Sequence, residues 1–288
     1  MWRIEIAGKA ALSAISDRAI RSSPIQGQSN YTTQCVVFAT FDRSCYLENQ
    51  GGRLVCLGEL SVGCGPLNAL VAQFKSPAVG TILSLDIAGT IPWQPTHPVG
   101  SWTLQCHKRI HAAVRGLAPI DGLGGLLQGS HSPLIAHAKP ALKALQHWLQ
   151  IPHRTDFELS PVKKLLGLGP GLTPSGDDYL CGALIAMHSF GFGKLATQLW
   201  EYLLPDLSSL TNRISAAHLA AAAEGEGHEA LHACLNAVVQ DNTHPDTERQ
   251  GDLATALTQL AQVGHSSGFD ALAGAVAALN TCADLQLS

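Results

Sequence analysis

The spacing of hydrophobic residues changes near the middle of the chain. The first 130 residues hold short apolar runs of strand length, at 35–40, 53–57, 81–86 and 102–106. Gly, Pro, Asn and Ser separate these runs, as in Asn49-Gln50-Gly51-Gly52, which is typical of turns between strands. The pattern therefore predicts a β-rich N-terminal region.

One helix is expected to interrupt these strands, just after residues 63–65. Pro66 would occupy its first position, where the missing N–H is not needed. Apolar residues follow at helical spacing, at Leu67, Leu70, Val71 and Phe74.

The second half of the chain has a helical pattern. Apolar residues recur at i, i+3 and i+4 in six segments: 134–149, 178–187, 214–223, 230–239, 253–260 and 271–279. Gly225 stands where a glycine ends a helix, and Asp246 or Thr247 could begin another. We expect an α+β protein, with a β-rich domain of residues 1–130 packed on an α-helical domain of residues 131–288. The glycine-rich stretch 121–130 is expected to be a linker or an ordered turn.

Composition narrows the possible partners. Only 14% of the 288 residues are charged, against about 25% in average proteins, while 46% are hydrophobic. Such a surface predicts contacts with other subunits, in a homo-oligomer or a stable complex. The net charge of −4 argues against nucleic acid as the main partner.

The same features indicate a cytoplasmic protein outside the membrane. No apolar run approaches the roughly 18 residues of a membrane span. Glu5 and Lys9 stand where a signal peptide would need an apolar segment. The eight cysteines include no C-x-x-C pair and lie mostly in apolar stretches, so we expect reduced thiols.

The most informative stretch runs from Leu165 to Gly182. Glycines at 167, 169 and 171 permit positive φ angles and allow a ligand to approach the backbone. A helix is expected to begin here, either with Thr173 as cap and Pro174 in the first position, or with a capping box from Ser175 to Asp178. Either start places the positive end of a helix beside the glycine loop, which favours a small anion.

This stretch differs from a nucleotide-binding P-loop at two positions. Gly171 and Gly176 have the P-loop spacing, but Asp177 and Asp178 replace its Lys and its Ser or Thr. Two carboxylates would repel a bare phosphate. They are consistent with a metal bridge, with a bound amine or amide, or with a purely structural cap, and these alternatives stay open.

A second stretch, residues 264–279, resembles the first. Aligning 175–186 with 267–278 matches Ser, Gly, Asp, Leu, Gly, Ala and Ala at equivalent positions. This suggests an internal duplication, in which two similar helix N-termini point at one pocket for a small anion.

Polar residues between these stretches could contribute to the same site. Thr211, Ser215 and His218 form a polar stripe at i, i+4 and i+7 on an apolar helix, which is either functional or a solvated face. Arg213 has a planar guanidinium that suits a carboxylate or a phosphate.

Histidines give weaker signals. His228 and His232 have the i, i+4 spacing of metal ligands, but no H-E-x-x-H motif is present, so no metal site is expected. His265 precedes two serines without a G-x-S-x-G motif, which favours helix capping over nucleophilic catalysis.

Three motifs, at 167–178, 211–216 and 264–270, resemble the bacterial family of AllH. AllH is a subunit of the oxamate carbamoyltransferase of anaerobic allantoin degradation, a route of purine catabolism. The resemblance implies a transferase complex that handles oxamate, carbamoyl phosphate and phosphate, without implying which subunit is catalytic. The chain lacks the Ser-x-Arg-Thr-Arg phosphate motif of aspartate and ornithine carbamoyltransferases, so we do not expect their fold.

We therefore expect a subunit of a carbamoyltransferase-type complex that binds a small anionic substrate. The sequence motifs do not indicate a particular cofactor. The catalytic candidates, chosen by chemistry, are Asp177, Asp178, Arg213 and His265. The ligand-binding candidates are Gly169, Gly171, Thr173, Ser175, Gly176, Thr211, Asn212, Ser266, Ser267 and Asp270. Because the capping box does not use Asp177, the change Asp177→Asn is expected to leave the fold nearly unchanged.

Two other interpretations stay open. The chain could be a non-catalytic assembly subunit whose motifs are helix caps, or a metal-dependent hydrolase that uses the pair of aspartates.

Overall fold

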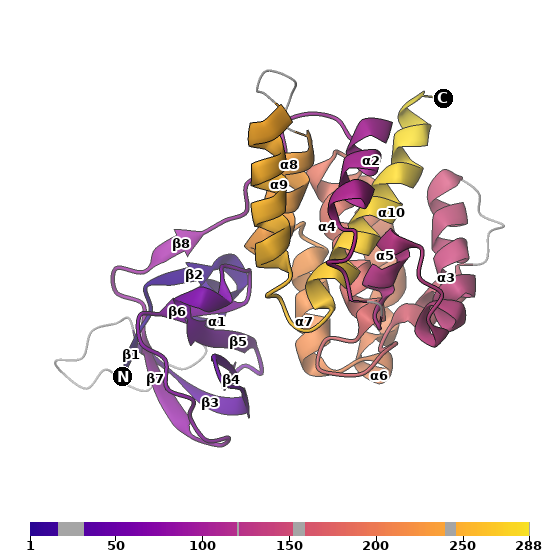
Figure 1. Ribbon diagram of the computed structural model, residues 1–288. Coiled ribbons are helices and arrows are strands. Elements are labelled where there is room, and N and C mark those ends of the chain that lie inside the picture. The colour runs from indigo at the N-terminus through magenta and orange to yellow at the C-terminus, as the bar shows by residue number, and fades with distance from the viewer. Residues whose placement is uncertain (17–31, 120, 152–158, 240–245, 288) are drawn as a thin grey trace. The chain divides into compact units, whose positions relative to one another are not determined.

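The computed structural model describes residues 1–16, 32–119, 121–151, 159–239 and 246–287. The chain forms two compact units, Met1–Pro95 and Thr96–Ser288 (Figure 1). The first unit is mainly strand and the second mainly helix, so the predicted α+β class is confirmed. The domain boundary at residue 130 stays a prediction.

The first unit is built on one eight-stranded sheet with the order β1-β7-β3-β4-β5-β6-β2-β8. Its strands are β1 (Trp2–Arg3), β2 (Ile6–Gly8), β3 (Thr32–Thr40), β4 (Ser44–Asn49), β5 (Leu54–Glu59), β6 (Asn68–Val71), β7 (Ile82–Asp86) and β8 (Ile91–Trp93). Helix α1 (Lys9–Ser16) buries Ala11, Ala14 and Ile15 in a core shared with the sheet. The strands expected at 35–40, 53–57 and 81–86 are confirmed as β3, β5 and β7.

Two expected elements are wrong. Residues 68–71, expected in a helix, form strand β6, which pairs with β5 and β2. All four residues of β6 are buried, and a strand buried on both faces has no polar alternation to distinguish it from a helix. Residues 102–106, expected as a strand, lead into helix α2 (Leu104–Ala113), whose first turn is capped by Thr103 through the N–H of Cys106.

The second unit contains the six expected helical segments, and all six are confirmed. Its helices after α2 are α3 (Pro133–Gln150), α4 (Ser175–Ser189), α5 (Gly193–Leu203), α6 (Leu207–Leu210), α7 (Arg213–Ala222), α8 (Glu229–Val239), α9 (Asp246–Leu260) and α10 (Ser267–Leu287). Short 3-10 turns, η3 (Leu123–Gln128) and η4 (Ser160–Leu165), precede α3 and α4. Within the described residues, no helix combines the length and the apolar character that crossing a membrane requires.

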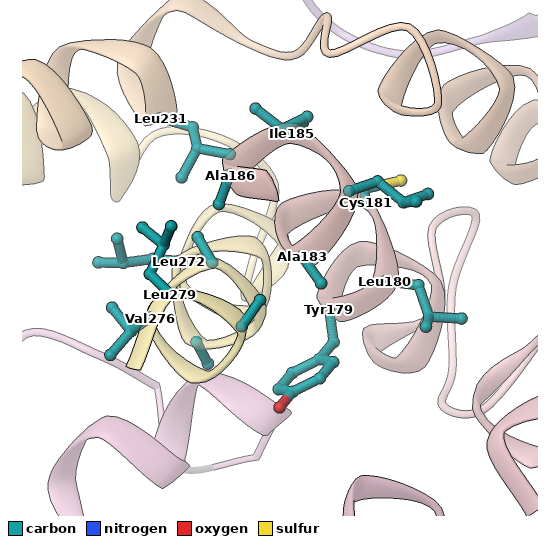
Figure 2. Close-up of a cluster of buried hydrophobic side chains, with 14 of the residues drawn as sticks. Tyr179, Leu180, Cys181, Ala183, Ile185, Ala186, Leu231, Leu272, Val276 and Leu279 are labelled. Carbon is teal, nitrogen blue, oxygen red and sulfur yellow. The ribbon is translucent and has the colours of Figure 1, made fainter. Parts of the chain in front are cut away.

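Helices α4 and α10 form the centre of this unit. Every residue of α4 from Ser175 to Met187 is buried, as expected for a core helix. Figure 2 shows apolar side chains of both helices in one cluster, such as Leu180 of α4 and Leu272 of α10. The residues that begin these two helices are therefore held by a rigid core.

Glycines allow the two helices to touch. A methyl group on Gly182 would lie 1.7 Å from the carbonyl oxygen of Ala271, and one on Gly274 would lie 1.8 Å from that of Tyr179. In the aligned stretches Gly182 corresponds to Gly274 and Tyr179 to Ala271. Each helix therefore makes the equivalent contact on the other.

Candidate functional site

The structure brings the two glycine-containing motifs together. The hydroxyl oxygens of Thr173 and Ser267 lie 2.8 Å apart, although 94 residues separate them in sequence. Thr173 precedes α4 and Ser267 begins α10, so this contact marks the point where the two helix N-termini meet. Three aspartates, Asp177, Asp178 and Asp270, are buried around it.

The loop before α4 has the backbone that its glycines predict. Gly167, Gly169 and Gly171 have φ angles of 69°, 114° and 97°, a region that other residues rarely adopt. At Gly167 a methyl group would also lie 2.0 Å from the carbonyl oxygen of Leu210. Asn212 donates its amide to the carbonyl of Leu172 at 2.8 Å, which ties the loop to the start of α7.

The start of α4 differs from both expected caps. Pro174 is the N-cap residue with an extended ψ of 142°, and no side chain caps the helix. The N–H of Gly176 donates to the carbonyl of Leu168 at 2.9 Å, and the N–H groups of Asp177 and Asp178 donate to that of Pro174. Because backbone carbonyls satisfy this turn, the side chains of the motif make contacts across helices instead.

Asp177 connects three segments. Its Oδ1 accepts the N–H of Gly167 at 2.9 Å, and its Oδ2 accepts the hydroxyls of Thr211 and of Ser215, the latter at 2.7 Å. Burial raises the pKa of this carboxyl, while the three hydrogen bonds act in the opposite direction. Asp177 thus holds the glycine loop and α7 against α4.

Asp178 is different because one of its oxygens has no partner. The residue is 8% exposed, and its Oδ2 is buried without a hydrogen bond to any described atom. Burial raises the pKa of Asp178 well above its usual value, and the charges of Asp270 and Asp177 add to this shift. Hydrogen bonds from Ser267 and Thr173 favour the charged form and oppose the shift.

Asp270 connects α10 to the glycine-rich stretch 121–130. Its Oδ1 accepts the N–H of Gly124 at 2.6 Å, and its Oδ2 accepts the hydroxyl of Ser266 at 2.8 Å. Burial raises its pKa against these hydrogen bonds and against others from Ser175 and Leu123. A methyl group at Gly122 would lie 2.4 Å from Oδ1. Of the two alternatives for this stretch, the structure shows the ordered turn, and its backbone contributes to the site.

The two aligned stretches, 175–186 and 267–278, make reciprocal contacts. Ser175 at the start of α4 bonds to Asp270, and Ser267 at the start of α10 bonds to Asp178. These residues occupy equivalent positions in the aligned stretches. The sequence comparison found the equivalence, but not that each serine serves the aspartate of the other stretch.

Other candidate residues lie outside this cluster or have structural contacts. Asn212 caps α7 by accepting the N–H groups of Ile214 and Ser215, both at 3.0 Å. Arg213 is exposed in the first turn of α7. The side chain of His265 is 84% exposed, with its Nε2 3.9 Å from a carboxylate oxygen of Asp121.

The histidine pair at the start of α8, one residue before the helix and one within it, contacts the backbone. His228 accepts the N–H of Ala230, and His232 accepts that of Gly227, both at 3.2 Å. Burial lowers the pKa of His232 to about 4, with further contributions from His97 and His228. In the parts of the chain that the structure describes, no three His, Cys, Asp or Glu side chains are grouped to hold a metal ion.

Comparison with known proteins agrees with the motifs. Residues 165–279 match the family described as oxamate carbamoyltransferase subunit AllH. The matched segment begins just before the glycine loop and ends within α10, so it contains all three motifs. The resemblance inferred from those motifs is therefore confirmed. No solved structure matches the chain.

Proposed function

We propose that this chain is a subunit of a carbamoyltransferase-type complex and binds a small anionic ligand where α4 and α10 begin. Oxamate, carbamoyl phosphate and phosphate are the candidates, because the matched family is described as an oxamate carbamoyltransferase subunit. The observation that carries this proposal is the 2.8 Å contact between Thr173 and Ser267, which joins the two motifs at one place.

The residues around this contact suit the chemistry of carbamoyl transfer. The reaction needs hydrogen-bond donors around a phosphate leaving group and around a carbonyl oxygen that gains charge. Two helix N-termini supply a positive potential there. The hydroxyls of Thr173, Ser175, Ser266 and Ser267 bond to the buried aspartates, and a ligand bound there would receive these hydrogen bonds in exchange. Asp177 positions the glycine loop, and Asp178 and Asp270 are the acidic groups closest to the hydroxyls.

Arg213 and His265 complete the proposed set. Arg213 lies two residues after Thr211, whose hydroxyl binds Asp177. His265 lies two residues before Ser267. Both side chains are exposed, and each follows or precedes a residue of the cluster closely in sequence, which is why they belong to the proposal. The cytoplasmic location is also part of the proposal, and it is supported by the eight cysteines, which are all free thiols.

Removing the Thr173 hydroxyl is expected to weaken ligand binding. The change Thr173→Val keeps the shape but loses a donor in the site, so affinity should fall about tenfold for the ligand that binds wild type. Calorimetric titration of the full chain with oxamate, carbamoyl phosphate and phosphate measures this. Thr197→Val, on the exposed face of α5, is the matched control and should bind as wild type does. Equal affinities for Thr173→Val and wild type, or no binding to wild type, would contradict the proposal.

An assembly subunit without its own ligand site is the second candidate, and the charged fraction of only 14% favours it. Both candidates predict association. The purified chain should be a homo-oligomer or carry a partner subunit when measured by light scattering at micromolar concentration. A monomer with no co-purifying protein would argue against both.

A further inference from the structure

We infer that Asp178 is a specificity-determining residue whose unpartnered oxygen accepts an N–H from the amide or carbamoyl group of the ligand. This inference rests on the proposed function, and it names the class of ligand: an anion that carries a terminal carboxamide nitrogen. Phosphate and other anions without an N–H group would then bind the same place less tightly.

The three buried aspartates differ in how their oxygens are satisfied. Both oxygens of Asp177 accept hydrogen bonds from within the chain, and so do both oxygens of Asp270. Oδ2 of Asp178 accepts none, although it is fully buried. Buried polar atoms in native proteins are nearly always paired, so an unpaired carboxylate oxygen indicates a missing partner that is itself a donor.

The position of Asp178 relates this oxygen to the proposed site. Thr173 and Ser267 are both hydrogen-bond partners of Asp178, and their hydroxyl oxygens lie 2.8 Å from each other. Each hydroxyl has one proton, so one of the two donates to its neighbour while the other donates to the carboxyl group. Both are partly exposed, whereas Asp178 is not. A ligand that inserts between these two hydroxyls would lie next to the carboxyl group to which they bond.

The site therefore offers two opposite kinds of recognition. The N-termini of α4 and α10 and the hydroxyls favour negative charge, while the free oxygen of Asp178 favours an N–H donor. A bare dianion satisfies the first and is repelled by the second. Oxamate and carbamoyl phosphate each have an anionic end and an NH₂ group, so they satisfy both.

The test compares pairs of ligands that differ only at the nitrogen. Carbamoyl phosphate and acetyl phosphate differ by NH₂ against CH₃, and oxamate and oxalate differ by NH₂ against O⁻. Calorimetric titration of the wild-type full chain should show at least tenfold tighter binding of the nitrogen-bearing member. A site built around a hydrogen bond discriminates strongly against analogues that leave its polar group unpaired.

Substitution of Asp178 identifies the residue responsible. In Asp178→Asn the side chain can turn a donor toward the ligand, so the preference within each pair should fall to threefold or less. Asp178→Leu should abolish the preference, and circular dichroism would confirm that both variants are folded. Glu201→Gln removes an exposed carboxylate of α5 and should keep the wild-type preference.

The outcomes separate this inference from the proposed function. If wild type binds both members of each pair equally and Asp178→Asn leaves these affinities unchanged, Asp178 does not recognise the nitrogen of the ligand. The proposed anion site is not contradicted by that result. If wild type binds none of the four ligands, the proposed site itself is wrong and the inference falls with it.

Discussion

Replacing Gly182 by alanine is expected to destabilise the helical unit by about 3 kcal/mol or more. The added methyl group would lie 1.7 Å from the carbonyl oxygen of Ala271, and this oxygen belongs to the backbone of α10. A backbone atom in a core helix cannot rotate away as a side chain can. The two helices would have to separate and lose packing along their whole contact.

Urea denaturation of the purified chain measures this effect as a shift of the midpoint at constant slope. Gly274→Ala should behave alike, because its methyl group would lie 1.8 Å from the carbonyl oxygen of Tyr179. Gly193→Ala is the control, since its nearest neighbour is a side-chain atom of His188 at 3.3 Å, and its effect should stay within about 1 kcal/mol. A Gly182→Ala variant as stable as this control would refute the close helix contact.

Asparagine substitutions at Asp177 and Asp178 are expected to have opposite effects on stability. Asp177→Asn should lose about 2–4 kcal/mol, because an amide accepts through one oxygen only and the three hydrogen bonds to a charged carboxylate cannot all be kept. Asp178→Asn should be as stable as wild type or more stable at pH 7, because it removes a buried charge that has an unpaired oxygen. Thermal unfolding of both variants beside wild type provides the comparison.

The pH dependence of stability provides a second measurement on Asp178. The pKa of Asp178 is raised in the folded chain, so the folded state binds the proton more tightly than the unfolded state. Its contribution to stability is therefore complete below the unfolded pKa, near 3.8, and is lost as pH rises through the raised folded pKa. Asp178→Asn should flatten this decline. An unchanged slope would show that Asp178 does not titrate as its burial indicates.

The expectation that Asp177→Asn would leave the fold nearly unchanged followed from assuming a capping box. In the structure the helix is capped by backbone groups, and Asp177 binds Gly167, Thr211 and Ser215 instead. The first of these lies ten residues away in sequence and the others more than thirty. Such contacts are set by how the helices pack, which local residue patterns do not encode.

Local patterns determined six helical segments of the second half and the strands β3, β5 and β7 of the first. Helical periodicity persists over ten or more residues in segments such as 134–149, and the glycines at 167, 169 and 171 require a specific backbone wherever they lie. The likeness between 175–186 and 267–278 was also visible in sequence. These features depend on residues close together in the chain, so sequence alone was sufficient to predict them.

Only the tertiary structure decided how these pieces combine. Strand β6 was mistaken for a helix because it is buried by neighbours on both sides, and its four residues carry no period of their own. Gly122 and Gly124 belong to the site because the turn that contains them lies against α10. Asp270, which accepts the N–H of Gly124, follows that glycine by 146 residues in the sequence. Helix packing also decides which donors lie beside each carboxylate, and it leaves one oxygen of Asp178 without a partner. These contacts join residues far apart in sequence, so they form only when the whole core packs.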